Sequence, residues 1–526
     1  MRAFTGTARL LRFHLRRDRL MLLCWSAGAV VLYYAQAVSV DGLYSTQAEF
    51  DRAAAGMESN AAFIAMAGPA RALNTTGGQV AWQASAFGAI VAGLMSMFLV
   101  GRHTRAEEES GRDELVRAAA VGRHAPLAAA AAVVVIANVL LGALVAGSLI
   151  SYGLAAAGSV SLGLAAGLAG LVFGAVALVA AQLTESTRAA YGLTGAFLGV
   201  AYVLRAAGDI GNGVLSWFSP IGWGQAMRAF ADEIWWPALL SVVAIALLGI
   251  AAVALLERRD IGSGVLPARP GPARGGRTTG SSLGLAWRLQ RGALMGWAVG
   301  LLLASVAYGS IGDDVGDLIG DSDFAQDVFG QGGGSPVDAF YGTAALMLAL
   351  IGTGFAVSSV LRLRGEETSH HAELLLATAV PRWRWAASHL LVTVGGTVGV
   401  VTLAGIGLGL GFGLVTGDFS TAPGLLGATA QYAVPVLLVA AVAWLAYGIR
   451  SAWGAFGWVA LLFCVVVMFF GEALRLPSWL TDVSPFQHLA LMPAAGFRPI
   501  PVVVLLALTA AVAAAGLWSL RRRDMA

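Results

Sequence analysis

The chain has 526 residues, of which 58% are hydrophobic and only 12% charged, and its formal net charge is +3. Soluble domains carry about 25% charged residues, so this composition excludes an ordinary soluble protein. The sequence contains no lysine, which excludes a Walker A phosphate loop because the lysine of that loop reaches the nucleotide phosphates. Cys24 and Cys464 lie in apolar runs and indicate small buried side chains, not a disulfide or a metal pair.

The first 38 residues combine a basic start with an apolar run. Arginines interleaved with leucine and phenylalanine over 1–19 predict an amphipathic helix on the inner membrane surface. The run at 20–38 is long enough to cross a hydrocarbon core of about 30 Å. Ala35-Gln36-Ala37 imitates the cleavage site of a signal peptide. The length of the run and its counterpart in the second half favour a retained span.

The rest of the first half alternates polar and apolar stretches. Residues 39–79 are polar and mixed, which predicts an outer loop. Residues 209–235 are semi-polar and contain several tryptophans, which collect at membrane interfaces, so we expect a pair of short re-entrant helices in the outer leaflet. Further spans are expected at 80–101, 125–149, 158–183, 189–208 and 236–256.

The second half begins after a stretch rich in Gly, Pro, Ser and Arg at 261–282, which predicts a flexible linker. Ser282–Arg291 resembles a second short surface helix. Alternate glycines from Gly405 to Gly413 lie inside an apolar run, which favours close helix packing over a nucleotide loop. Spans are expected at 292–311, 338–361, 385–413, 422–448, 452–471 and 499–519.

Two charged stretches are closely similar. The first patch is Arg105–Arg123 and the second patch is Arg364–Arg382, at an offset of 259 residues (364 − 105). Other matches are Trp25 with Trp297, Ser219-Pro220 with Ser484-Pro485, and Arg258-Arg259-Asp260 with Arg522-Arg523-Asp524. The duplication predicts three parts, which are a first six-span half at 1–260, a cytoplasmic linker at 261–282 and a second six-span half at 283–526.

Arginine placement predicts the orientation, because cytoplasmic loops carry an excess of basic residues. Both termini, both patches and the linker are rich in arginine, whereas the loop at 312–337 carries aspartates and no arginine. We therefore expect a multi-pass protein of a bacterial plasma membrane with cytoplasmic termini. Two halves of equal orientation predict a pseudo-twofold axis along the membrane normal. The expected fold class is an all-α polytopic membrane protein with two tandem six-helix halves.

Helical spacing within the first patch suggests how it is arranged. Glu114 and Leu115, followed by Ala118 and Val121, recur at the period of an α-helix. Such a helix, lying parallel to the membrane, is expected to bury its apolar face and to present Glu107, Glu108 and Arg123 to the cytoplasm. The matched second copy favours a function over a merely solvated loop.

These residues resemble a known family. An R-x-E-E stretch followed by E-L and a small-residue run ending in arginine is similar to the coupling helix of ABC type-2 exporter permeases. Its place between spans two and three, the amphipathic start and the semi-polar segment before span six also match. The fused twelve-span form resembles actinobacterial polyketide-antibiotic (tetronasin-type) exporter permeases. The resemblance covers essentially the whole chain.

The resemblance implies a transport subunit that is not itself an enzyme and binds no cofactor. A separate ABC ATPase, expected as a homodimer, would hold ATP and Mg²⁺ and dock on both patches. The cargo would be a hydrophobic compound such as an antibiotic or drug, and nucleic acid would not be a partner. The residues expected to couple to the ATPase are Arg105, Glu107, Glu108, Glu114, Arg123, Arg364, Glu366, Glu367, Glu373 and Arg382.

The family also implies a substrate route between spans two and five of each half. Flexible methionines and flat aromatic rings in these spans suit variable apolar ligands, although each also suits simple packing. The residues expected along the path are Met95, Phe98, Phe197, Tyr202, Met347, Phe355, Phe463 and Met468.

Three other functions are alternatives. An ion-coupled secondary multidrug transporter would need ionisable residues near span centres, and the sequence offers almost none. An exporter of lipids or cell-envelope components shares the permease features. A membrane enzyme acting on lipids would need an acid–base or metal constellation, and His370-His371 alone does not form one. Glu472 and Arg475 are expected either to pair or to gate an exit.

Overall fold

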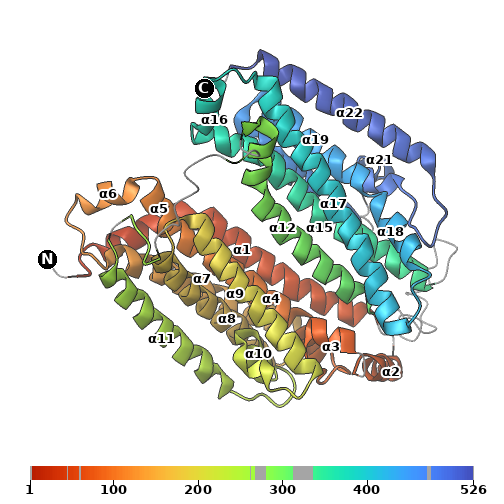
Figure 1. Cartoon of the computed structure of the whole chain (residues 1–526). Coiled ribbons are helices and arrows are strands. Elements are labelled where there is room, and N and C mark those ends of the chain that lie inside the picture. Colours follow the sequence, from red (N-terminus) through yellow and green to blue (C-terminus); the bar gives the residue numbers. More distant parts are fainter. Residues whose placement is uncertain are drawn as a thin grey trace. The chain divides into compact units, whose positions relative to one another are not determined.

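The structure is a computed structural model, and every long regular element among its described residues is an α-helix (Figure 1). It describes residues 3–43, 46–58, 61–260, 262–266, 276, 280–311, 336–470 and 476–524. Within these ranges, 12 helices are long and apolar enough to cross a membrane. The predicted all-helical, multi-pass membrane protein is confirmed at this level.

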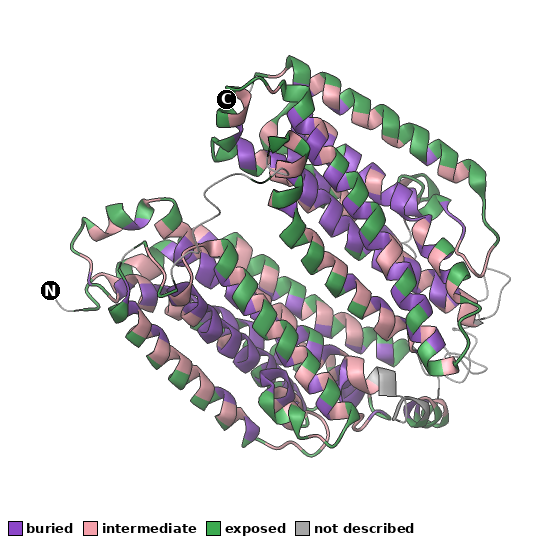
Figure 2. Cartoon of the chain, viewed as in Figure 1, coloured by how far each residue is buried: buried purple, intermediate pink, exposed green. Residues whose placement is uncertain are grey.

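The chain divides into two compact units, Met1–Gly271 and Pro272–Ala526. The boundary falls within the predicted linker at 261–282, and six of the candidate spans lie on each side of it. Each unit has its own hydrophobic core. In each, buried residues gather on the inner helices and the last helix is largely exposed (Figure 2).

The first unit is built around one central helix, α8. Its spans are α1 (Thr7–Leu43), α4 (Thr76–His103), α7 (Ala125–Tyr152), α8 (Ala156–Leu183), α9 (Thr187–Ile210) and α11 (Pro237–Arg258). Helix α8 packs against α4, α7, α9 and α11. Shorter helices are α2 (Gln47–Glu58) and α3 (Ala61–Ala67) in the predicted outer loop, and η1 (Leu215–Phe218) and α10 (Pro220–Ala226) in the semi-polar segment.

The second unit repeats this order. Its spans are α12 (Ser282–Gly309), α15 (Pro336–Thr368), α17 (Arg382–Thr416), α18 (Ala422–Ala430) with α19 (Ala433–Ile449), η4 (Ser451–Ala455) with α20 (Phe456–Phe470), and α22 (Pro499–Arg522). Helix α19 packs against α15 and α22, as α8 packs against α4 and α11. The short helices α21 (Ser478–Thr481) and η5 (Pro485–His488) take the place of η1 and α10.

Helix boundaries follow local signals in the sequence. Thr75 and Ser186 begin α4 and α9, and each hydroxyl accepts a hydrogen bond from a backbone N–H in the first turn. Pro237 occupies the first position of α11, where its missing N–H costs nothing. Gly153 ends α7 in the left-handed conformation that glycine adopts without strain.

A separate surface helix at 1–19 is not formed, because α1 runs without interruption from Thr7 to Leu43. Its basic end packs against α4, where Asp18 lies 2.9 Å from Arg102 and also pairs with His103. Asp18 therefore serves helix packing, whereas Arg9, Arg12, Arg16 and Arg19 are exposed. The second predicted surface helix, Ser282–Arg291, is likewise the first part of the continuous helix α12.

Small residues allow helices to approach backbone to backbone. A side chain on Gly163 of α8 would clash with the carbonyl oxygen of Gly142 on α7. In the second unit, a side chain on Gly411 of α17 would clash with the carbonyl oxygen of Val306 on α12. The close packing predicted from the glycines at 405–413 is confirmed, in a pattern typical of helices associating in lipid.

Gly411→Ala is expected to lower the stability of the chain by about 1–3 kcal/mol, because the added methyl group meets backbone that cannot rotate away. Thermal unfolding in detergent measures the effect. Gly399→Ala on the same helix is the matched control, since nothing lies within 4 Å of its added carbon and alanine favours a helix. A Gly411→Ala protein that melts at or above the wild-type temperature would contradict this packing.

Candidate functional site

The first patch directly follows α4, and the second patch begins in the last turns of α15. In the first, α5 (Arg105–Glu109) and α6 (Arg112–Arg117) are separated by a turn in which Gly111 has φ +70°. In the second, α15 runs on through Thr368, and His370 with φ +59° leads into α16 (His371–Leu376). Gly111 and His370 occupy matching positions in the duplication. The same left-handed turn is therefore kept although the residue differs.

Glu108 is the centre of a buried ionic cluster in the first patch. Its carboxylate lies 2.5 Å from Arg259 Nη2 and 2.7 Å from Arg105 Nη1. Arg259 follows the last helix of the unit, and its Nε donates to Gln182 Oε1 at the end of α8 (2.7 Å). Arg105 has no exposed surface and donates to the carbonyl oxygens of Ala181 and Ser263. The cluster thus ties the patch to the ends of α8 and α11.

The neighbouring glutamates reach two other spans. Glu107 lies 2.5 Å from Arg17 Nη1 on α1. Glu109 accepts from the backbone N–H of Thr187 (2.9 Å) and from its hydroxyl (2.7 Å), at the first turn of α9. An anion at a helix N-terminus is favoured by unpaired N–H groups and by the helix dipole. Three consecutive carboxylates therefore connect the first patch to α1, α9 and the end of α11.

Glu367 plays the part of Glu108 in the second patch. Its oxygens lie 2.9 and 2.8 Å from Nη2 of Arg523, which follows the last helix of this unit. The hydroxyl of Tyr447 on α19 donates to the same carboxylate (2.7 Å). Glu366 pairs with Arg362 one turn earlier on α15 (2.6 Å). We call the matched pairs Glu108–Arg259 and Glu367–Arg523 the clamps.

The arginine that ends each patch repeats a second contact. Arg123 Nη2 donates to the carbonyl oxygens of Leu256 (3.1 Å) and Arg259 (3.5 Å) at the end of α11. Arg382 Nη1 donates to the carbonyl oxygen of Arg523 (3.3 Å) after α22. A cation at a helix C-terminus satisfies carbonyl groups that the helix leaves unpaired. Each patch is therefore attached to the last helix of its unit at both of its ends.

The predicted orientation of the patches is wrong. Arg123 is exposed as expected, but Glu107 and Glu108 turn toward the spans, as do the matching Glu366 and Glu367. The side chains of Glu108 and Glu367 are each only 8% exposed. The physical reason is that buried arginines of neighbouring helices need these carboxylates as counter-charges. Leu115 and Leu374, expected on the buried face, are instead 76% and 74% exposed. The coupling role of these residues stays a prediction.

The other predicted coupling residues divide by exposure. Glu114 and Glu373 are exposed, and Glu373 pairs with His370 at 2.7 Å. Arg364 is half-buried, whereas its counterpart Arg105 is fully enclosed. The two patches therefore share the clamp but differ in how the first arginine is used.

The residues predicted along the substrate path differ in how far they are exposed. Met95 and Phe355 lie inside the cores of their own units and are 0% and 1% exposed, so packing accounts for both. Phe98 and Phe197 expose 36% and 40% of their surface and remain candidates for the path. Four further side chains are half-buried, namely Tyr202, Met347, Phe463 and Met468.

The sequence analysis did not identify the arginines of the clamps, Arg259 and Arg523, although their segments match each other in the duplication. Each half contains both a patch and an Arg-Arg-Asp segment, and the repetition of both could have indicated that they contact each other. Tyr447 carried no such signal, because its position in the first half is not a tyrosine. Glu472 and Arg475 lie outside the described residues, and within those residues no three His, Cys, Asp or Glu side chains gather as a metal site.

Glu108→Gln is expected to destabilise the first patch by about 3–5 kcal/mol, because Arg105 and Arg259 stay buried without a counter-charge. Hydrogen–deuterium exchange of peptides covering 105–117 should rise strongly. Glu114→Gln, an exposed carboxylate in the same patch, should leave the exchange unchanged. Equal protection in both variants would show that the clamp does not hold the patch.

Two comparisons show which known proteins this chain is similar to. The family described as the multidrug efflux system permease Rv1217c, C-terminal domain, matches residues 280–521. The multidrug efflux system permease protein Rv1217c of Mycobacterium tuberculosis (strain ATCC 25618 / H37Rv) is 38% identical over 530 residues, which cover 99% of this chain and 96% of that protein. The chain therefore belongs to the family of the efflux system permease Rv1217c.

Proposed function

We propose that this chain is the transmembrane permease subunit of an ATP-driven exporter of hydrophobic compounds. The observation that carries the proposal is the repeated clamp with an exposed leucine beside it. In each unit the carboxylates hold a short helix onto the spans, while Leu115 or Leu374 is left open. Apolar side chains exposed on a charged, helical element are typical of a protein-docking surface.

The clamps suit a part that must transmit movement. A partner changes the conformation of the permease only if it contacts two states of the permease differently. A patch attached through Glu107, Glu108 and Glu109 to several spans moves together with them. We infer that the partner pushes on the leucines. In the first unit, Glu107, Glu109 and the clamp would carry the displacement to α1, α9 and the end of α11, respectively.

The proposed partner is a separate ABC ATPase that binds ATP and Mg²⁺. Support comes from the lysine-free sequence, which leaves no residue for a phosphate loop. One chain offers two patches of similar build, which suits one ATPase homodimer with each subunit on one patch. This assignment makes both patches and both termini cytoplasmic and locates the chain in the bacterial plasma membrane.

The proposed cargo is a hydrophobic drug or antibiotic. The name of the 38% identical relative describes multidrug efflux, and the resemblance to polyketide-antibiotic permeases indicates cargo of the same apolar class. Phe98 and Phe197, which lie partly exposed on α4 and α9, offer flat apolar contacts. The pseudo-twofold arrangement of the halves and the re-entrant position of the short helices belong to the same proposal.

Replacing both exposed leucines tests the docking surfaces. Leu115→Asp and Leu374→Asp should each reduce co-purification of the co-expressed ATPase, and the double variant should abolish it together with ATP-dependent drug uptake into inverted vesicles. The reason is that an apolar contact is replaced by a charge at the centre of the interface. A larger effect of either single variant would show that the two patches are not equivalent.

Leu266→Asp provides the control, because Leu266 is 60% exposed in the first unit but lies outside both patches. It should retain ATPase binding and transport. Unfolding temperatures of all variants should match the wild type, since the replaced side chains pack against nothing essential. Wild-type association and transport in the double variant would overturn the docking proposal.

A further inference from the structure

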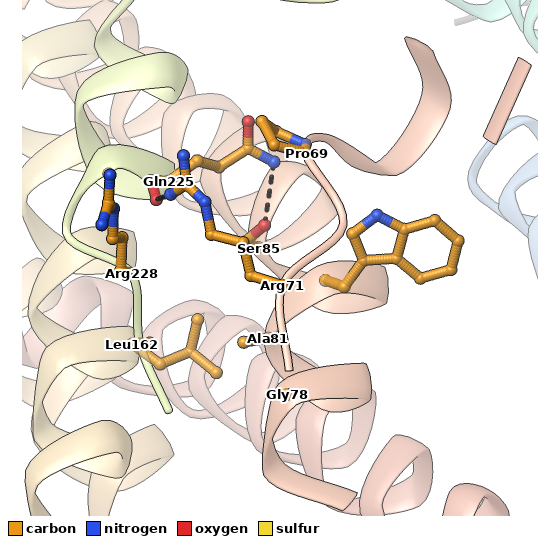
Figure 3. Close-up of a pocket in the computed structure, with 11 residues that line it drawn as sticks. Pro69, Arg71, Gly78, Ala81, Ser85, Leu162, Gln225 and Arg228 are labelled. Carbon is orange, nitrogen blue, oxygen red and sulfur yellow. Dashed lines mark hydrogen bonds between the residues drawn. The ribbon is translucent and has the colours of Figure 1, made fainter. Parts of the chain in front are cut away.

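A small pocket lies at the end of the first unit farthest from the first patch. Helix α4 runs from Thr76, beside this pocket, to His103, next to the patch, and its 28 residues span about 42 Å. The pocket is bounded by the segment before α4, by α10 and by the segment that follows α10 (Figure 3). Its volume is about 40 Å³, enough for a few waters or one small ionic group but far below a drug-sized site.

Two arginines line the pocket, and neither forms an ion pair with an acidic side chain that the structure describes. Arg71 Nη1 donates to the backbone carbonyl of Gln225 (3.1 Å). The side chain of Arg228 is exposed and makes no hydrogen bond with any residue that the structure describes. Figure 3 shows both guanidinium groups beside Gln225. Burial, followed by the neighbouring charge of Arg228, lowers the pKa of Arg71, and the charge of Asp209 offsets this only in part.

Asp209, the carboxylate whose charge acts on Arg71, is already engaged with other residues. Asp209 accepts a hydrogen bond from the Ser216 hydroxyl (2.5 Å) and lies 3.6 Å from Arg205 Nη1. Ser85, which lines the pocket, accepts from Gln225 Nε2 (3.0 Å), and its own hydroxyl hydrogen remains available to a ligand. The pocket therefore offers two cations and a hydroxyl donor, together with the positive end of the α4 dipole at Gly78.

The backbone that holds Arg228 is strained. Arg228, Phe230 and Asp232 have φ of +53°, +62° and +55°, and Ala72 beside Arg71 has φ +48°. Residues other than glycine rarely adopt this left-handed backbone conformation, and residues strained in this way are common at functional sites. The Phe230 ring wedges against Gly77 and Gly158, where any added side chain would clash with it. Packing of this ring therefore fixes the turn that brings Arg228 to the pocket.

The residues near the pocket indicate that it lies at the depth of the lipid headgroups. Trp217, Trp235 and Trp236 are exposed in the same segment, and the rings of Trp217 and Trp236 stack at 5.2 Å. Exposed tryptophans mark the interface between hydrocarbon and water. The second half does not repeat the site, because the register of Ser219-Pro220 with Ser484-Pro485 aligns Arg228 with Pro493. The arginine is thus not a requirement of the shared fold.

We propose that this pocket binds the phosphate group of an anionic phospholipid between Arg71 and Arg228. The two guanidinium groups neutralise the phosphate, Ser85 donates one further hydrogen bond, and the acyl chains extend along the exposed apolar surface of the unit. Arginine suits this task because its planar fork matches the geometry of phosphate oxygens. The site would anchor lipid at one half of the permease only.

Native mass spectrometry of the purified full chain tests the proposal. Samples are incubated with phosphatidylglycerol, with zwitterionic phosphatidylcholine, or with phosphatidylglycerol plus millimolar inorganic phosphate. The wild type should retain phosphatidylglycerol about tenfold better than phosphatidylcholine. The double variant Arg71→Gln with Arg228→Gln should lose this preference. Arg52→Gln, an exposed arginine of α2 with no part in the pocket, should keep it.

Each outcome decides the proposal. Retention of the preference in the double variant would overturn the site. Binding of inorganic phosphate that displaces the lipid, or phosphate binding without any lipid preference, would assign the pocket to free phosphate and overturn the lipid. Unfolding temperatures measured without lipid separate loss of binding from loss of fold, and Arg71→Lys with Arg228→Lys, which keeps both charges, should restore part of the preference.

Discussion

The clamps are the constraint on which the patches depend. In each unit a buried glutamate on the second span meets an arginine that follows the sixth span, Glu108 with Arg259 and Glu367 with Arg523. Removing one partner of such a pair leaves an uncompensated charge, so the elements at the two ends of a half are held in contact. The short helices of the patches lie between these contacts. The exposed Leu115 and Leu374 are therefore held in fixed positions on the surface of their units, although α6 and α16 are each only six residues long.

Much of the fold could be predicted because its signals are local. Apolar runs gave all twelve candidate spans, and caps such as Thr75 and Ser186 account for where the helices begin. The glycines of α17 predicted a close approach, which the structure contains. The prediction of a separate surface helix at 1–19 was wrong, because hydrophobic periodicity does not show which neighbouring helix the polar residues contact. The polar face of α1 is used by Arg102 and His103 of α4, and nothing within 1–19 indicates this.

The site was predicted in position but not in orientation. Its boundaries followed from the repeat, whereas the direction of Glu108 and Glu367 depended on arginines more than 140 residues away. Glu108 and Leu115 lie on separate short helices, α5 and α6, so the helical period of the sequence leaves open which of the two side chains is covered. Buried guanidinium groups decided the question, since burying a leucine gains less than leaving an arginine unpaired loses. The pocket at Arg71 and Arg228 had no linear signal, because strained backbone and packing of Phe230 bring these residues together.

Each clamp closes within its own half, and this has a consequence for how such a permease arose. Every residue that holds the first patch belongs to residues 1–271, and every residue that holds the second belongs to 272–526. Neither clamp uses a residue of the other half. Fusion of two ancestral half-length genes would therefore leave both clamps intact. Afterwards each copy was free to change separately, as Gly111 and His370, or Arg228 and Pro493, illustrate.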